Sequence, residues 1–477
     1  MHQNTRQRLI NNFPRSSAQH LPNTSNANGS SNLRRVGYIE YDMSRMLGES
    51  VKTFVYVGYV VEKSLESIVD KKKVAVKKIV CGSAEDCQKN LQEVKILLNC
   101  DEHENIVKYY KTETDQDFNV YIAMELCLGT LQQWMEGNIP TIQPENVNPV
   151  QLLKQTTKGV AYLHGKRDAI IHRDLKPDNI LLKLVGGKVC VKIADFGISR
   201  VLPHERTSLT IKTYSGTRGW KSPEILNAHS SPPGNLRAHP RMTRATDIFS
   251  LGCVFYYVLS GGRHPFDQNG NSPNPELRDP NILRDRKNTK IEHFSPRIGG
   301  YIRLLEQMID KAPQQRPSAA EILSSPLFWG HDKELNFLVH ISNLMQENKS
   351  PVIQWCKNQI EEDHSNNEDE FLPGLELNNV GWMNRTCEAL DFYFMYESPR
   401  TYDEFLTKDL IRAIRNMGTH YETLSPSVKA SVGSLPGKFM AFWNNRFPFL
   451  VQTVWNVCKV LITDPDFDSV LMFYQTG

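Results

Sequence analysis

The sequence lacks the features that mark secreted, membrane-spanning and zinc-binding proteins. No apolar segment of a signal peptide follows the basic residues near the N-terminus, and no uninterrupted apolar run reaches about 18 residues. The nine cysteines are odd in number and scattered, without close C-x-x-C pairs. We therefore expect free thiols in a reducing compartment and no membrane segment in this chain.

A strong charge imbalance and internal repeats are also missing. The formal net charge is only +3, so binding of nucleic acid through bulk charge is not expected, and any such site must be local. The absence of a repeat argues against solenoid architectures. With 40% hydrophobic and 23% charged residues, most of the chain should fold, and 477 residues predict about two to four domains.

The apolar pattern divides the chain into three parts. Residues 1–36 contain few large apolar side chains and are predicted to be a disordered tail or linker. Residues 37–329 begin with strand-like runs and continue with helical ones, which predicts a two-lobed α+β domain. Residues 330–477 have almost wholly helical spacing, which predicts an all-α domain, with an acidic, Asn-rich loop at 361–379.

The strand-rich part has a more detailed pattern. Apolar β-rich runs at 54–60, 74–79 and 120–126 predict strands, and residues 91–98 predict a helix. Farther along, loops rich in proline and glycine at 230–242 and 264–280 interrupt a mostly helical region.

Several short motifs occur in a fixed order within residues 37–329. The H-R-D-x-x-x-x-N pattern spans 172–179, and D-F-G follows at 195–197. Val74-Ala75-Val76-Lys77 precedes them, with Glu93 in the next helical pattern. Ser222-Pro223-Glu224, Asp247 and Arg316 come after them. Two such motifs at this separation are very specific, and residues 40–329 resemble the protein kinase family.

The resemblance implies a role for each motif residue in phosphoryl transfer, which depends mainly on positioning and electrostatics. Lys77, paired with Glu93, would hold the α- and β-phosphates of ATP or ADP. Asp174 would accept the hydroxyl proton, and Lys176 would steady the γ-phosphate. Asn179 and Asp195 would bind Mg²⁺. The nucleotide pocket would be formed by Gly48, Val55, Ala75, Lys77, Glu125, Cys127 and Leu181.

The glycine-rich loop departs from the family pattern. Residues 48–53 keep only the first glycine, Gly48, and the loop is one residue short. Without the later glycines the backbone approaches phosphates less freely. Nucleotide binding should survive, which leaves two alternatives: an active kinase or a nucleotide-sensing module.

The segment between D-F-G and Ser222 predicts regulation by phosphorylation. It contains hydroxyl side chains near basic residues, so an added phosphate could pair with arginine and order the loop. The alternative is a merely polar, flexible loop. The candidate phosphorylation sites are Ser208, Thr210, Thr213 and Ser215.

A second group of reactive side chains occurs in the C-terminal part. Residues 407–421 predict a helix capped by Thr407, with apolar residues on its buried face (Leu410, Ile411, Ile414 and Met417). Asn416 and His420 are four residues apart and should share a solvent-facing stripe, with Arg412 and Arg415 beside it and Tyr402 before the helix.

Such a group suits cleavage of an RNA phosphodiester without metal. A proton must leave the 2′-hydroxyl, the phosphorane charge must be held, and the 5′-oxygen must be protonated. Histidine exchanges protons near neutrality, which suits the last step. From the residues alone, a solvated helix face is the more common explanation of this pattern.

The wider pattern is similar to a known nuclease domain. Thr401-Tyr402, residues 409–416, His420-Tyr421, Ser434-Leu435-Pro436 and Arg446-Phe447-Pro448 resemble the kinase-extension nuclease (KEN) domain. That domain occurs in the inositol-requiring stress kinase of the unfolded-protein response and in ribonuclease L. Residues 40–477 resemble the stress kinase more closely, since 121–127 and 247–257 also match it.

This resemblance implies the nuclease roles. His420 would be the general acid, Arg415 and Asn416 would hold the scissile phosphate, and Tyr402 would orient or deprotonate the nucleophile. The products would carry a 2′,3′-cyclic phosphate and a 5′-hydroxyl.

The resemblance also implies a bifunctional serine/threonine kinase and metal-independent endoribonuclease in endoplasmic-reticulum stress signalling. RNA would be the substrate, and nucleotide binding with formation of a homodimer or higher oligomer would activate cleavage. The chain would be cytoplasmic, or the cytosolic portion of an endoplasmic-reticulum membrane protein. Two alternatives remain: a soluble ribonuclease-L-like nuclease with a nucleotide-sensing pseudokinase, and a non-catalytic kinase-like scaffold.

Overall fold

The computed structural model divides the chain into two compact units. The first comprises residues 1–288 and 308–319, and the second comprises residues 289–307 and 320–477. The structure describes residues 32–63, 69–98, 103–143, 147–210, 216–230, 241–268, 274–290, 293–347, 350–365 and 381–475.

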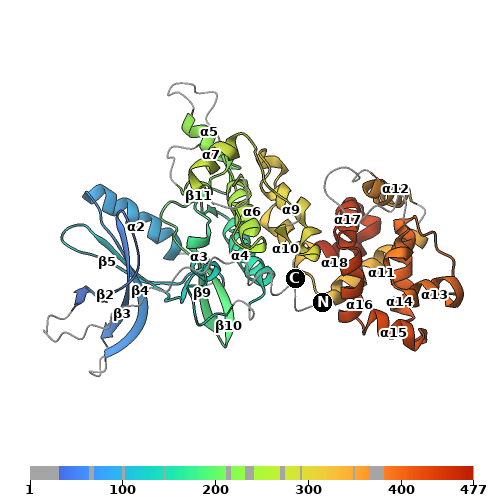
Figure 1. Cartoon of the computed structure of the whole chain (residues 1–477). Coiled ribbons are helices and arrows are strands. Elements are labelled where there is room, and N and C mark those ends of the chain that lie inside the picture. The colour runs from blue at the N-terminus through green and yellow to red at the C-terminus, as the bar shows by residue number, and fades with distance from the viewer. Residues whose placement is uncertain are drawn as a thin grey trace. The chain divides into compact units, whose positions relative to one another are not determined.

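The first unit begins with a six-stranded antiparallel sheet in the order β1-β2-β3-β4-β6-β5, and α2 lies alongside it (Figure 1). Its elements are β1 (Leu33–Val36), β2 (Ile39–Ser50), β3 (Thr53–Lys63), β4 (Val69–Ile79), α2 (Ala84–Leu98), β5 (Tyr109–Thr114) and β6 (Val120–Met124). The strands and the helix expected from the sequence are confirmed.

The N-terminal end of the sheet differs from the prediction. Residues 33–36 were expected in a disordered tail, but they form β1 and pair with β2 from Leu33↔Asp42 to Val36↔Ile39. Backbone pairing and the ion pair of Arg35 with Glu40 (3.4 Å) stabilise this edge without a large apolar contribution. The rest of the predicted tail, residues 1–31, lies outside the described residues.

One face of the sheet carries a small apolar core. Val74 and Val76 of β4 are fully buried there with Ile39 and Tyr121. Because side chains alternate along a strand, Ala75 and Lys77 project from the other face. Lys77 pairs with Val55 in β3 and with Ile122 in β6, so its side chain lies on the face of the sheet opposite this core.

The remainder of the first unit is mainly helical, around the almost wholly buried helix α6. A three-stranded sheet (β10-β9-β7) and two strand pairs (β11-β8 and β12-β13) lie among the helices. Its elements are β7 (Gly129–Thr130), α3 (Leu131–Met135), α4 (Pro149–Gly165), β8 (Ala169–Ile171), η2 (Pro177–Asn179), β9 (Ile180–Val185), β10 (Lys188–Ile193), β11 (Arg200–Leu202), β12 (Leu209–Thr210), α5 (Pro223–Ser230), β13 (Arg241–Met242), α6 (Ala245–Leu259), α7 (Pro275–Leu283) and η4 (Pro313–Gln315). The predicted α+β arrangement, in which a strand-rich part is followed by a mainly helical part, is confirmed.

The second unit is built from helices, and no strand occurs among its described residues. Trp382 and Trp443 are buried in a single apolar core with Phe439 and Phe447. The helices are α8 (Pro296–Gly299), α9 (Ile302–Met308), α10 (Ala319–Ser324), η5 (Pro326–Phe328), α11 (His331–Glu347), α12 (Pro351–Ser365), η6 (Trp382–Arg385), α13 (Glu388–Phe392), η7 (Tyr393–Glu397), α14 (Thr407–Thr419), η8 (Tyr421–Thr423), α15 (Pro426–Val432), α16 (Gly437–Arg446), α17 (Leu450–Cys458), η9 (Lys459–Thr463), η10 (Pro465–Val470) and α18 (Leu471–Tyr474).

The all-α prediction is therefore confirmed, with one local difference. Residues 361–365 were expected in a loop and instead complete helix α12, while 366–380 lie outside the described residues. No described helix has the length and apolarity needed to cross a membrane. The predicted boundary at residue 330 stays a prediction.

Candidate active sites

The loop of residues 172–179 is fixed from behind by Asp247 of α6. This buried carboxylate accepts backbone N–H groups from His172 and Arg173, each at 2.8 Å, and contacts His164 Nε2 at 2.8 Å. Burial opposes ionisation of Asp247, but the contacts with His164 and the backbone outweigh it, so its pKa is lowered. The His172 ring also contacts the Ala194 carbonyl (2.9 Å), which joins this loop to D-F-G.

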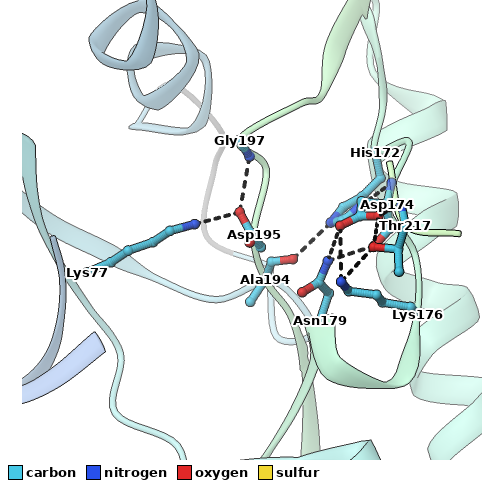
Figure 2. Close-up of polar contacts among 9 residues, drawn as sticks. All are labelled: Lys77, His172, Asp174, Lys176, Asn179, Ala194, Asp195, Gly197 and Thr217. Carbon is cyan, nitrogen blue, oxygen red and sulfur yellow. Dashed lines mark hydrogen bonds and ion pairs between the residues drawn. The ribbon is translucent and has the colours of Figure 1, made fainter. Parts of the chain in front are cut away.

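Both carboxylate oxygens of Asp174 are held in defined positions (Figure 2). Thr217 donates its backbone N–H and its hydroxyl to Oδ1, each at 2.8 Å, and Asn179 donates Nδ2 to Oδ2 at 3.0 Å. Lys176 donates to the Thr217 hydroxyl at 2.7 Å and lies 3.6 Å from Asp174 Oδ2. Thr217 was not predicted as a site residue. It connects the segment between D-F-G and Ser222 to the loop of residues 172–179.

Lys77 forms an ion pair with Asp195 of D-F-G at 2.6 Å. Burial raises the pKa of Asp195, but the charge and hydrogen bond of Lys77 dominate and lower that pKa to about 2. Asp195 adopts a left-handed backbone conformation (φ 62°), which is uncommon outside glycine. Glu93, the predicted partner of Lys77, lies in α2, but its side chain is outside the described residues.

The residues predicted to bind Mg²⁺ have suitable oxygen atoms. Asn179 turns its amide nitrogen to Asp174, so its amide oxygen is available, and Asp195 is ionised (Figure 2). No group of three or more His, Cys, Asp or Glu that could hold a metal occurs within the described parts of the chain. A magnesium ion would therefore depend on these two side chains and on phosphate oxygens, which is its usual mode of binding.

The predicted nucleotide pocket draws on the sheet and on β9. Gly48 pairs with Val55, and a two-residue turn, Val51-Lys52, joins β2 to β3. The glycine-poor loop is thus a tight hairpin. Ala75 in β4 is buried, and Leu181 in β9 is half-buried.

The segment that follows β6 contains two other predicted pocket residues. The Glu125 carboxylate contacts Lys183 at 2.7 Å and Lys192 at 3.1 Å, so its charge is balanced within the protein. Burial opposes ionisation of Glu125, yet the two lysines outweigh it and lower its pKa. Cys127 is half-buried, and burial raises the pKa of its thiol to about 12.

The phosphorylation candidates are only partly described. Ser208 is half-buried, Thr210 is exposed in β12, and Thr213 and Ser215 lie outside the described residues. Beyond this segment, Glu224 and Arg316 form a buried two-point ion pair, with both nitrogen–oxygen distances at 2.9 Å. It ties the end of the segment to the following helices.

The helix at the second site forms as predicted, but its cap differs. Thr407 is the first residue of α14, and its buried hydroxyl has no partner in the described structure. Glu361 of α12 instead accepts the backbone N–H groups of Thr407 (2.8 Å) and Lys408 (2.9 Å). The first N–H groups of a helix have no partner within the helix, and a carboxylate can accept two of them. Its negative charge also complements the helix dipole.

Three of the four predicted nuclease residues are joined by hydrogen bonds. Arg415 donates to Asn416 Oδ1 (2.6 Å), and Asn416 donates Nδ2 to the Tyr402 hydroxyl (2.8 Å). Asn416 was expected on a solvent-facing stripe but is only 5% exposed, because the Tyr402 segment covers it. His420 is exposed, one turn away, and is linked through its backbone N–H to the Asn416 carbonyl (2.9 Å).

Tyr402 is anchored by its ring. Phe394 and Trp382 lie edge-on to it, with ring centres 5.6 and 6.3 Å away, and the Arg412 guanidinium lies 4.9 Å from the ring centre. Arg412 also donates to the Thr401 carbonyl (2.6 Å) and pairs with Asp409 (3.3 Å). Arg412, predicted beside the reactive face, therefore holds the tyrosine segment.

Two residues that the sequence did not reveal complete this cluster. Arg400 donates to Asn416 Oδ1 at 2.7 Å. Asn343 of α11 accepts from Arg415 Nε (2.8 Å) and Nη2 (2.6 Å). Arg400 precedes Tyr402 by only two residues, so its closeness to the tyrosine could have been foreseen. Nothing in the sequence connects Asn343 with Arg415 across 72 positions.

The family comparison decides the class of the first unit. A model of the protein kinase domain matches residues 57–328, which is more than half of the chain. The chain belongs to the protein kinase family. A second model, ribonuclease 2-5A, matches residues 334–470, so this kinase carries a ribonuclease-type domain after the kinase.

Curated relatives share both parts. The chain is 32% identical over 452 residues to serine/threonine-protein kinase/endoribonuclease IRE1 of Hypocrea jecorina, covering 88% of this chain and 34% of that protein. It is 32% identical over 429 residues to IRE2 of Homo sapiens (88% and 41%). It is 31% identical over 434 residues to the sensor for unfolded proteins in the ER, ire1, of Schizosaccharomyces pombe (85% and 37%).

These matches confirm the predicted resemblance to the kinase/endoribonuclease family. The chain spans between about a third and two fifths of the length of these relatives. A protein kinase domain implies nucleotide binding, usually with Mg²⁺, as expected from the sequence.

Proposed function

We propose that this chain is a bifunctional serine/threonine protein kinase and endoribonuclease. The observation that carries the proposal is the presence, in one chain, of an ordered kinase catalytic loop and a Tyr402–Asn416–Arg415 cluster within the segment that matches ribonuclease 2-5A. The names of the relatives, which couple kinase with endoribonuclease, support the same reading.

In the kinase half, the residues hold and orient the two substrates. Asp174 accepts the proton of the attacking hydroxyl, and Thr217 and Asn179 keep its carboxylate oriented. Lys77 and Lys176 hold the nucleotide phosphates, with Glu93 as partner of Lys77 in the closed state. When bound at Asn179 and Asp195, Mg²⁺ supplies neutralising charge to the phosphates.

In the nuclease half, the cleavage requires no metal. Tyr402 orients or deprotonates the 2′-hydroxyl, Arg415 and Asn416 stabilise the charge at the phosphate, and His420 protonates the leaving oxygen. Asn416 donates to the Tyr402 oxygen, so the Tyr402 hydroxyl hydrogen is not used in that bond. The exposed His420 ring makes no hydrogen bond within the described residues, which suits a group that must meet RNA.

One observation favours a second candidate for the kinase half. The tight Val51-Lys52 hairpin lacks the glycines that let a backbone approach phosphate closely. A module that binds ADP or ATP and transfers phosphate slowly, as in a ribonuclease-L-like protein, would tolerate this turn. In that case the nucleotide acts as a signal for the nuclease.

Nucleotide binding and pairing of two chains would activate cleavage. A nucleotide can favour a dimer only by its differential affinity for that state. By analogy with the relative named as a sensor for unfolded proteins in the ER, the signal belongs to endoplasmic-reticulum stress, with this chain on the cytosolic side. A non-catalytic scaffold would dimerise without cutting RNA.

The first test asks whether the chain cuts RNA. Purified protein is incubated with a stem-loop RNA in EDTA, which excludes contaminating metal nucleases, and the product ends are analysed. Products with a 2′,3′-cyclic phosphate and a 5′-hydroxyl support the proposal. Absence of cleavage, with and without ADP, would favour the scaffold.

The second test measures coupling. Initial cleavage rates are measured against protein concentration, with and without ADP, beside sedimentation of the same samples. The rate should rise more steeply than linearly, and ADP should shift the curve to lower protein concentration. A strictly proportional rate that ignores ADP would contradict gating by the kinase half.

A further inference from the structure

Two arginine side chains of the second unit meet at one amide oxygen. Arg400 Nη1 and Arg415 Nη1 donate to Asn416 Oδ1 at 2.7 and 2.6 Å. Arginine can only donate, so these contacts fix which end of the Asn416 amide is oxygen, and the nitrogen then faces Tyr402. The result is a pair of guanidinium groups beside the Tyr402 hydroxyl.

No described carboxylate lies within ion-pair distance of either guanidinium, and the shared acceptor is neutral. The neighbouring Arg412 differs, because Asp409 lies 3.3 Å from it. Two like charges held together repel each other, and an anion placed between them removes that repulsion. Guanidinium groups match the geometry of phosphate oxygens.

Asn343 determines which part of Arg415 is available. Its Oδ1 accepts from Nε at 2.8 Å and from Nη2 at 2.6 Å, while Nη1 reaches Asn416. Arginine has five N–H donors, so one on Nη1 and one on Nη2 remain for a ligand. Arg400 is exposed and uses one nitrogen within the described protein.

We propose that Arg400 and Arg415 bind one phosphate of the RNA backbone between them, and that Asn343 is the positioning residue that orients Arg415. The proposal rests on the proposed ribonuclease function and deepens it. Asn416 holds the two arginines through Oδ1 and Tyr402 through one Nδ2 hydrogen, which leaves its second Nδ2 hydrogen for the phosphate.

The test compares arginine variants on two nucleic acids in the full chain. One is a defined stem-loop RNA, and the other is its all-2′-deoxy version, which keeps the phosphates but lacks the attacking hydroxyl. Cleavage gives kcat/KM at several salt concentrations with ADP present, and fluorescence anisotropy gives the affinity for the deoxy stem-loop. Arg400→Gln and Arg415→Gln each remove one of the two positive charges, whereas Arg400→Lys keeps the charge. As a control, Lys408→Gln removes an exposed charge from α14, the helix that contains Arg415.

Arg400→Gln should lower kcat/KM by about tenfold to hundredfold, as expected for one lost hydrogen bond to a charged group. The slope of log affinity against log salt should become shallower by about 0.7, because one phosphate contact is lost. Arg400→Lys should keep the slope of the wild type, and Lys408→Gln should keep both values. A merely structural role would not change the slope.

Asn343 is tested by loss and rescue. Asn343→Leu removes the acceptor and should reduce kcat/KM by about tenfold or more, while Asn343→Asp keeps two acceptor oxygens and should restore it to within about fivefold of wild type. Failure of Asn343→Asp to restore more activity than Asn343→Leu would contradict the positioning role.

The two proposals fail in different ways. If wild type cuts RNA but Arg400→Gln has its full activity, affinity and salt slope, the shared phosphate site is wrong and the nuclease function stands. The opposite outcome is that the wild-type protein cuts no RNA, while Arg400→Gln lowers the affinity for the deoxy stem-loop and makes its salt dependence shallower. In that case the phosphate site stands and the cleavage function is wrong.

Discussion

The two candidate sites balance charge in opposite ways. In the kinase half, Lys77 lies against Asp195 and Lys176 lies near Asp174. In the second unit, Arg400 and Arg415 share a neutral amide oxygen, and no described carboxylate balances them. A nucleotide arrives with a metal ion, so its site can be nearly neutral beforehand. RNA arrives as a polyanion, and a site for it is expected to keep positive charge unpaired.

Removing the kinase base should give the largest effect. Asp174→Asn loses the carboxylate that accepts the hydroxyl proton, so autophosphorylation should fall by at least about a hundredfold, while ADP affinity stays nearly unchanged. The measurements are incorporation of labelled phosphate and calorimetric titration of ADP. Wild-type protein that incorporates no phosphate into residues 200–218 would contradict the active-kinase proposal. Unchanged RNA cleavage in ADP would support separate roles for the two sites.

A balanced arginine and an unbalanced one should differ in their effect on stability. The Arg316 side chain is 0% exposed and pairs with Glu224, so Arg316→Met leaves a buried carboxylate and should cost about 3–5 kcal/mol of unfolding free energy. The matched change Arg415→Met leaves only neutral partners and should cost far less, while reducing RNA cleavage. Calorimetric unfolding compares the two, and equal losses of stability would remove the distinction.

Alanine variants of Asn416 and His420 should distinguish a structural role from a catalytic one within the nuclease cluster. Both alanine variants should lose RNA cleavage. Asn416→Ala leaves two arginines and Tyr402 without their partner and should cost about 1–3 kcal/mol. His420→Ala is an exposed change and should stay within about 0.5 kcal/mol. A stable His420→Ala variant that cuts RNA at the wild-type rate would exclude it from the mechanism.

A substitution at the N-terminus of α14 should have a smaller effect on stability. Glu361→Ala removes the acceptor of two backbone N–H groups and should cost about 1 kcal/mol, as for other helix caps. The adjacent exposed Glu362 is the control, and Glu362→Ala should change the melting temperature little. Equal shifts for both variants would show that capping is not the reason.

The smallest effect is expected from pH at the kinase site. The Lys77 charge holds the pKa of Asp195 at about 2, below its unfolded value, so the stability from this pair is present above about pH 4 and is lost as pH falls through about 2. The difference in melting temperature between wild type and Asp195→Asn should therefore be constant between about pH 5 and pH 7. A difference that shrinks across this window would contradict the low pKa.

The same contrast explains how much the sequence could predict. The kinase residues lie in short motifs whose spacing could be recognised in the sequence, and the resemblance to the protein kinase family then implied their roles. Asp247 could be placed by its helix. Thr217 could not, because its contact with Asp174 depends on how the activation segment folds back. The apolar face of α14 followed from the helical period.

The errors at α14 came from long-range contacts. Thr407 has the right chemistry for a cap, but Glu361, 46 positions earlier in the chain, takes that role. Helical spacing alone placed Asn416 at the surface, whereas the segment that contains Arg400 and Tyr402 covers it. The nuclease cluster needed the family resemblance to be recognised, and Asn343 required the folded structure.

Cys127, which is half-buried and is proposed to line the nucleotide pocket, has a consequence for inhibitor design. Because burial raises the pKa of its thiol to about 12, very little thiolate is present at neutral pH, and the thiolate is the reacting form. Mild electrophiles such as acrylamides, carried on an adenine-like scaffold, should therefore label this cysteine slowly. Reversible compounds that exploit the shape of the short Val51-Lys52 hairpin are the better route to selectivity.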